Sequence, residues 1–145
     1  MIGKRQLMRL AGVAGVLTAL AGCATSGPTF SEAKANLPAI PADQGRIFFY
    51  RTAVIGAAVQ PAVKLNDAVV GAAVPRGYFY ADRPAGNYVV STTTEVTRTL
   101  SLTLAPGQIR YVQLNIGMGF FVGHVYPELV DDTTGQTDIA SCRAI

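Results

Sequence analysis

The stretch from Val96 to Leu104 ends in a strict alternation of polar and hydrophobic side chains, which runs from Thr99 to Leu104. Leu100, Leu102 and Leu104 fall on one face of an extended chain, and threonine and serine residues fall on the other. This period of two predicts a β-strand with one buried and one wet face, and it does not fit a helix.

Other short hydrophobic segments follow one another at similar spacing, separated by turns rich in glycine, proline, asparagine and aspartate. Asn66-Asp67 joins two of them, and both residue types tolerate the positive φ of a tight hairpin. Val125–Val130 and Thr137–Arg143 are expected as the final strands, joined by a turn over residues 131–135. This pattern favours an all-β domain, an antiparallel β-sandwich of seven to eight short strands, or a small barrel.

The N-terminus has the three parts of a bacterial lipoprotein signal. Lys4, Arg5 and Arg9 precede an apolar run that is shorter than the about 20 residues needed to cross a bilayer. The run ends in the lipobox, which consists of Leu20, Ala21, Gly22 and Cys23. We therefore expect export, cleavage before Cys23 and attachment of acyl chains to that cysteine.

The signal divides the chain into a cleaved peptide over residues 1–22, a lipidated tether over 23–44 and a β-domain over 45–145. Ala24, in place of the aspartate that favours inner-membrane retention, points to the outer membrane, facing the periplasm. Thr29 and Glu32 match a capping box for a helical turn that Pro38 would end. Otherwise the tether is expected to be flexible, with a reach of roughly 70 Å when fully extended.

The charge of the mature chain is balanced. The whole sequence has 12 basic and 9 acidic residues, but three of the basic residues belong to the signal peptide. No basic stripe remains, so nucleic acid is not an expected partner.

The candidate catalytic and metal-binding residues are few. His124 is the only histidine, and Glu128 lies on the same strand face. A catalytic triad would also need a nucleophile beside His124, so a hydrolase using His124 is the least favoured function. Asp131, Asp132 and Asp138 surround a glycine, but their spacing does not match a calcium loop, and a solvated turn is the simpler interpretation. The sequence therefore predicts no catalytic residues, no metal and no cofactor.

Cys142 would have no intramolecular partner if Cys23 carries lipid. We expect it to be a small buried side chain on the last strand, with an intermolecular disulfide as the alternative. Three further residues, Arg51, Arg76 and Arg83, are expected as scattered surface arginines, although arginines can also bind phosphate or carboxylate groups.

Two groups of residues are candidates for a binding surface. The segment Gly117–Gly123 combines glycines with large apolar side chains, among them Met118, Phe120 and Phe121. It is either an exposed apolar loop, which would mark an interaction site, or a buried strand with close backbone approach. The aromatic runs around Tyr50, Tyr78 and Tyr80 are core residues or, alternatively, an exposed face for sugars or a protein.

Four features together resemble a known family. They are the run Arg46–Arg51, the hairpin that ends at Gly71, the Gly77–Gly86 segment with its Tyr-Phe-Tyr, and Pro106-Gly107 ahead of Tyr111. In these positions the chain is similar to the small bacterial lipoprotein domain of unknown function 2846, over most of residues 45–143, and more weakly to PEGA-type β-modules. The resemblance implies a β-fold and an envelope location, and it implies no activity.

The function expected from these observations is a non-catalytic accessory or protein-binding role in the cell envelope. The chain would be held on the periplasmic face of the outer membrane by lipid on Cys23, with an envelope protein as its partner. The alternative is a small-ligand or glycan-binding module with a pocket lined by Tyr50, Tyr78 or Tyr80.

Overall fold

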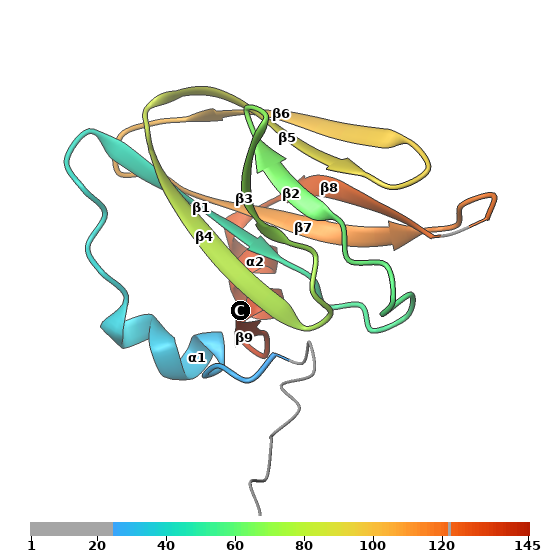
Figure 1. Ribbon diagram of the computed structural model, residues 1–145. Helices are drawn as coiled ribbons and strands as arrows, with labels where there is room; N and C mark the ends of the chain where they lie inside the picture. Colours follow the sequence, from blue (N-terminus) through green and yellow to red (C-terminus); the bar gives the residue numbers. More distant parts are fainter. Residues whose placement is uncertain (1–24, 122) are drawn as a thin grey trace, which may run out of the picture.

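The computed structural model describes residues 25–121 and 123–145, and it is a sandwich of two β-sheets (Figure 1). The five-stranded sheet A has the order β8-β7-β1-β4-β9, and the four-stranded sheet B has the order β3-β2-β5-β6. The strands are β1 (Gln44–Tyr50), β2 (Ala62–Leu65), β3 (Ala68–Ala72), β4 (Gly77–Pro84), β5 (Gly86–Thr93), β6 (Thr97–Leu104), β7 (Ile109–Gly117), β8 (His124–Val130) and β9 (Arg143–Ala144). The β-sandwich predicted from the sequence is confirmed.

The sequence led us to expect purely antiparallel sheets, but sheet A also contains parallel pairs. β1 runs parallel to β7, with Arg46 opposite Ile109, and β4 runs parallel to the short β9. The other neighbouring strands pair in the antiparallel sense. Sheet A is mixed because β7 reaches β1 only after the chain has passed through the other sheet, and local sequence patterns do not encode such a long-range pairing.

The main core lies between the sheets and is built from the alternation seen in the sequence. Leu102 and Leu104 of β6 are buried, whereas Ser101 and Thr103, which alternate with them, are exposed. Asn66 and Asp67 form the expected hairpin turn, with φ angles of 47° and 65°. The main core also contains Ile47, Phe49, Val63, Leu65, Val90, Val112, Leu114 and Val125.

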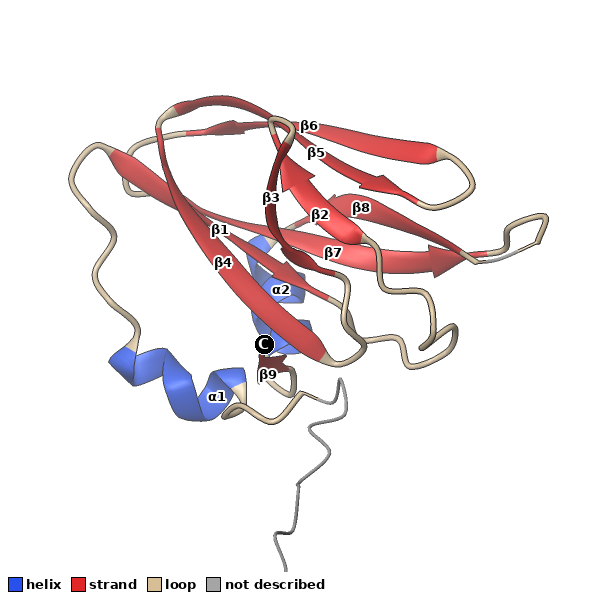
Figure 2. Cartoon of the chain, in the orientation of Figure 1, coloured by secondary structure: helices blue, strands red, loops and turns tan. Residues whose placement is uncertain are grey.

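A second core covers the outer face of sheet A. It lies under two helical segments, α1 (Phe30–Ala33) with the 3₁₀ turn η1 (Lys34–Asn36), and α2 (Asp132–Ile139), which Figure 2 shows in blue. Its buried residues are Phe30, Phe48, Tyr50, Tyr78, Tyr111, Ile139 and Cys142. The central strand β1 is therefore buried on both faces, which explains its continuous run of hydrophobic and aromatic side chains.

Helix α2 replaces a strand and a turn that the sequence analysis expected. Residues 132–139 are helical, so only the end of the proposed Thr137–Arg143 strand is extended. Asp131 is the N-cap and accepts hydrogen bonds from the backbone nitrogen and hydroxyl of Thr134. Gly135 faces Tyr111, and a Cβ at that position would lie 2.3 Å from the Tyr111 ring, so only glycine allows the helix this close to β7.

The expectation of a flexible tether over residues 23–44 is wrong for its described part. Thr29 and Glu32 form the expected capping box, but Phe30 of the same turn is 4% exposed and packs edge-on against Phe48 and Tyr78. The folded domain therefore begins well before residue 45.

The N-terminal segment is held along the C-terminal one by backbone hydrogen bonds. The nitrogen of Phe30 donates to the carbonyl of Cys142 at 2.8 Å, and the nitrogen of Ala144 donates to Pro28 at 3.0 Å. The Arg143 side chain adds a bond to the carbonyl of Gly27. This pairing leaves Thr25, the first described residue, close to the body of the domain.

Candidate functional site

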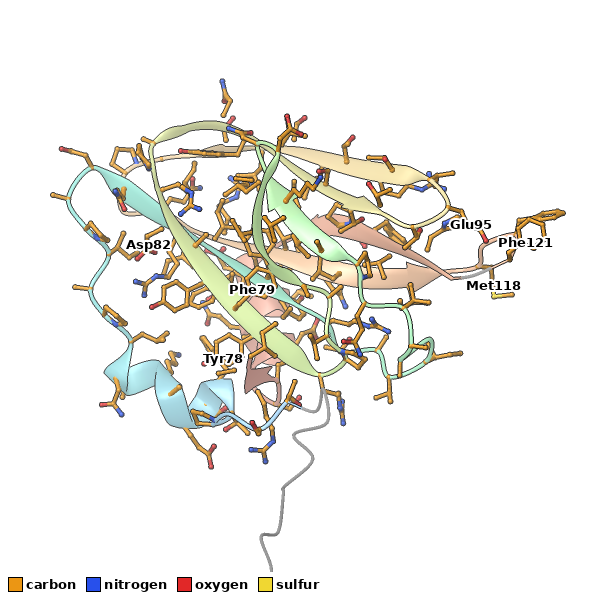
Figure 3. The ribbon with its side chains drawn as sticks, viewed as in Figure 1. Tyr78, Phe79, Asp82, Glu95, Met118 and Phe121 are labelled. Carbon is orange, nitrogen blue, oxygen red and sulfur yellow. The ribbon has the colours of Figure 1, made fainter. Side chains whose placement is uncertain are left out.

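Three large apolar side chains project into solvent from the connection between β7 and β8. Met118 is 95% exposed, and Phe120 and Phe121 are each 86% exposed. The two rings contact each other edge to face, with centroids 4.6 Å apart. We call Met118, Phe120 and Phe121 the aromatic tip, and Figure 3 shows Met118 and Phe121 at the far end of the β7–β8 hairpin. Of the two interpretations of this segment, the exposed loop is therefore the correct one.

Glu95 holds the backbone of the aromatic tip. It lies in the loop between β5 and β6, and its two carboxylate oxygens accept hydrogen bonds from the backbone nitrogens of Phe120 and Phe121. The first of these bonds is 2.9 Å long. Bonds of this kind to an ionised acceptor are stronger than neutral ones, so Glu95 fixes the loop while the rings stay outside. Glu95 could not be identified from the sequence, because its partners lie 25 and 26 residues away in the chain.

The β1–β2 loop adds apolar surface at the same end of the sandwich. Val54 and Ile55 in this loop are 57% and 77% exposed. The loop packs against the end of β7, since a Cβ on Gly56 would lie 3.6 Å from Ile116. Several apolar side chains from two loops thus gather near one end, which is a pattern that marks an interaction surface.

Arg51 organises the β1–β2 loop from inside the protein. Its side chain is fully buried, and its guanidinium donates to the backbone carbonyls of Ala53, Ile55, Gly56, Val59 and Ala73. The expectation of a surface arginine here is wrong. Burial lowers the pKa of Arg51, and the carbonyl oxygens compensate for the lost hydration of the charge.

The tyrosines proposed for a ligand pocket are mostly internal. Tyr50 is fully buried and Tyr78 is 3% exposed, so neither can line a binding surface. The Tyr50 hydroxyl donates to Asp138 on α2, and burial raises the pKa of Tyr50. Tyr80 is half-buried beneath the guanidinium of Arg46, which stacks over its ring at 4.3 Å.

His124 does not meet the residues that a catalytic triad would need. Its Nδ1 lies 3.3 Å from the hydroxyl of Thr94, whereas Glu128 accepts a hydrogen bond from Asn115. Within residues 25–121 and 123–145, no group of three or more His, Cys, Asp or Glu side chains is arranged to hold a metal ion.

Most of the other carboxylates have structural partners. Asp82 forms a bidentate pair with Arg46, at 2.7 and 2.8 Å. Asp131 caps α2, and Asp138 binds Tyr50. These acids are therefore used to hold strands and helices together.

The predicted modification site lies outside the described residues. Leu20, Ala21, Gly22 and Cys23 precede Thr25, so the structure gives no geometry for the lipobox. In the part of the chain that the structure describes, no helix is long and apolar enough to cross a membrane.

Comparison with known proteins gives one relative and one fold neighbour of interest. The chain is 28% identical to an uncharacterized protein of Haemophilus influenzae, over 94% of this chain and 83% of the relative. The N-terminal domain of AlgF from P. aeruginosa aligns with a TM-score of 0.45 and 16% identity, over 62% of this chain and 94% of that domain. Residues 41–125 match the family described as "Protein of unknown function (DUF2846)", so the chain belongs to the DUF2846 family.

Proposed function

We propose that this protein is a lipid-anchored binding module of the bacterial envelope, non-catalytic, with the aromatic tip as its contact surface. The observation that carries the proposal is the aromatic tip itself. Three large apolar side chains are 86–95% exposed while Glu95 fixes their backbone, so the fold presents them outward rather than burying them.

The envelope part of the proposal is supported by the N-terminal sequence. A basic start, a short apolar run and the lipobox Leu20–Cys23 occur in the order that lipoprotein processing requires. Ala24 supports the outer membrane, with the domain on its periplasmic side. Two or three acyl chains on Cys23 would anchor the protein stably.

The binding role is supported by how the polar side chains are used. The Arg46–Asp82 pair and the bond from Tyr50 to Asp138 hold one structural element to another. Asp131 caps α2, and His124 has a threonine as its hydrogen-bonding neighbour. Apolar contact at the aromatic tip is the interaction that the surface supports best.

A second candidate, binding of a small ligand, is favoured by a hollow beside the aromatic tip. This hollow has a volume of about 420 Å³ and is lined by residues that include Arg98, Met118, His124 and Tyr126. It combines one charged side chain with aromatic and apolar ones, as ligand sites do. The pocket lined by Tyr50 and Tyr78 that was considered from the sequence is not formed.

The proposal is tested in cells in two steps. Labelling with radioactive palmitate should mark the protein, and Cys23→Ser should abolish both the label and membrane association. A photo-crosslinking amino acid at position 121 should then capture whatever covers the aromatic tip, whereas the same group at Val69, an exposed site on sheet B, should not. Absence of label on the intact protein, or equal capture from both positions, would contradict the proposal.

A further inference from the structure

The strand directions bring the aromatic tip and the β1–β2 loop to one end of the sandwich. β1 and β7 are parallel, so their carboxyl ends, Tyr50 and Gly117, point the same way. The β1–β2 loop follows the first strand and the aromatic tip follows the second. Figure 1 shows both connections beyond the same ends of these two strands.

The described chain begins at this same end. Tyr78 of β4 lies opposite Tyr50, so Gly77 is also at the end of the sandwich where the aromatic tip lies. Thr25 is next to Gly77, since a Cβ on that glycine would lie 3.2 Å from the Thr25 side chain. Cys23 precedes Thr25 by two residues, which span about 7 Å at most. An acyl chain on Cys23 would therefore join the domain through Thr25, at the end of the sandwich that carries the exposed apolar loops.

The charged side chains of this end are mainly basic. Arg76 precedes β4, Arg98 is near the start of β6, and Arg143 pairs with Gly77; all three are exposed. Of the acids nearby, Glu95 binds the backbone of the aromatic tip, Asp138 accepts a bond from Tyr50, and Glu32 accepts a bond from the backbone of Thr29 in the capping box of α1, near Arg143. A surface with apolar side chains beside exposed arginines is complementary to the interface of a bilayer that contains anionic lipids.

We propose that the aromatic tip is inserted into the interfacial region of the bilayer that holds the acyl chains of Cys23, with Arg76, Arg98 and Arg143 facing lipid phosphates. This inference rests on the proposed function, because it requires the lipid anchor. It names lipid, rather than an envelope protein, as the occupant of the aromatic tip. The short link from Cys23 to Thr25 and the basic surroundings of that end favour lipid. The domain then lies against the membrane instead of standing away from it on a tether.

The absence of tryptophan from the sequence makes a direct test possible. Phe121→Trp places a single indole in the aromatic tip, and Met118→Trp provides an independent second position. Val69→Trp is the matched control, because Val69 is 63% exposed but belongs to sheet B, next to the β2–β3 turn. The lipidated mature variants are reconstituted into vesicles of phosphatidylethanolamine and phosphatidylglycerol that carry bromine atoms on their acyl chains.

Insertion predicts a blue shift of the indole emission and loss of most of its intensity for Phe121→Trp and Met118→Trp, with neither effect for Val69→Trp. If lipidated protein remains on the vesicles while both tip indoles keep the emission of water-exposed tryptophan, the insertion proposal is overturned and the anchor proposal stands. If the emission of the tip indoles shifts to the blue only after an envelope protein is added, the insertion proposal is also overturned, and a protein partner is the occupant of the aromatic tip. If the cellular protein carries no lipid, the proposed function itself fails, and this inference fails with it.

Discussion

The guanidinium of Arg51, at the end of β1, donates to the backbone carbonyl of Ala73, just beyond β3, at 2.7 Å. This bond joins sheet A to the connection that leaves sheet B. Four further carbonyls of the β1–β2 loop bind the same side chain. A single buried cation thus determines the path of the loop that presents Val54 and Ile55.

Replacing Arg51 should strongly destabilise the protein. Arg51→Met removes every donor and leaves five carbonyls without their partner, so we expect a loss of about 3 kcal/mol or more in the free energy of unfolding. Denaturant unfolding followed by circular dichroism measures this loss. Arg98→Gln, at an exposed arginine, should change the stability by about 0.5 kcal/mol at most. Equal unfolding midpoints for the two variants would contradict the structural role of Arg51.

Replacing Glu95 should loosen the aromatic tip without unfolding the sandwich. Glu95→Ala removes the acceptor of the Phe120 and Phe121 amides, so their hydrogen exchange should accelerate by about tenfold, the factor that corresponds to about 1.4 kcal/mol. Exchange followed by NMR measures each amide separately. Glu128→Ala, which removes the acceptor of the Asn115 side chain, is the matched control and should leave both amides unchanged.

Replacing Phe30 should release the N-terminal segment from the domain. Phe30→Ala removes a buried ring that contacts Phe48 and Tyr78, at a cost of about 3 kcal/mol. Limited proteolysis should then cut between residues 28 and 40 before the sandwich unfolds. Lys34→Ala, on the exposed side of the same segment, should leave the protein resistant to cleavage. If Phe30→Ala is equally resistant, the segment is held by its backbone bonds to residues 140–144 alone.

The regular strands could be predicted because local alternation determines which face of a strand is buried. Leu102 and Leu104 are buried as their spacing required, and Asn66 and Asp67 adopt the positive φ angles that a tight hairpin needs. The exposure of the aromatic tip was one of two open interpretations, since glycine-rich apolar segments are compatible with either a loop or a strand.

The elements that were missed depend on contacts between distant residues. Residues 131–135 suggested a turn because aspartate, threonine and glycine form helices poorly, yet Asp131 caps a helix whose Gly135 packs on Tyr111. Tyr50 and Tyr78 were candidates for a surface because nothing in their own strands shows that α1 and α2 cover the outer face of sheet A.

The thiol of Cys142 should be inert in the folded protein. It is fully buried, and burial raises its pKa from 9.0 to about 11, so the reactive thiolate is scarce at neutral pH. In a Cys23→Ser background, a thiol reagent should label Cys142 only after unfolding. Rapid labelling of the native protein, or a dimer linked by a disulfide, would contradict this burial.

The same burial predicts that stability falls at alkaline pH. Above pH 9.0 the unfolded chain loses the Cys142 proton while the folded protein keeps it until about pH 11, so ionisation favours the unfolded state across this interval. The free energy of unfolding should therefore decrease between about pH 9 and pH 11. Cys142→Ala should flatten this decrease, although part of it should remain because burial also raises the pKa of Tyr50. Denaturant midpoints measured across this range for both proteins check the prediction, and parallel curves would show that Cys142 does not contribute.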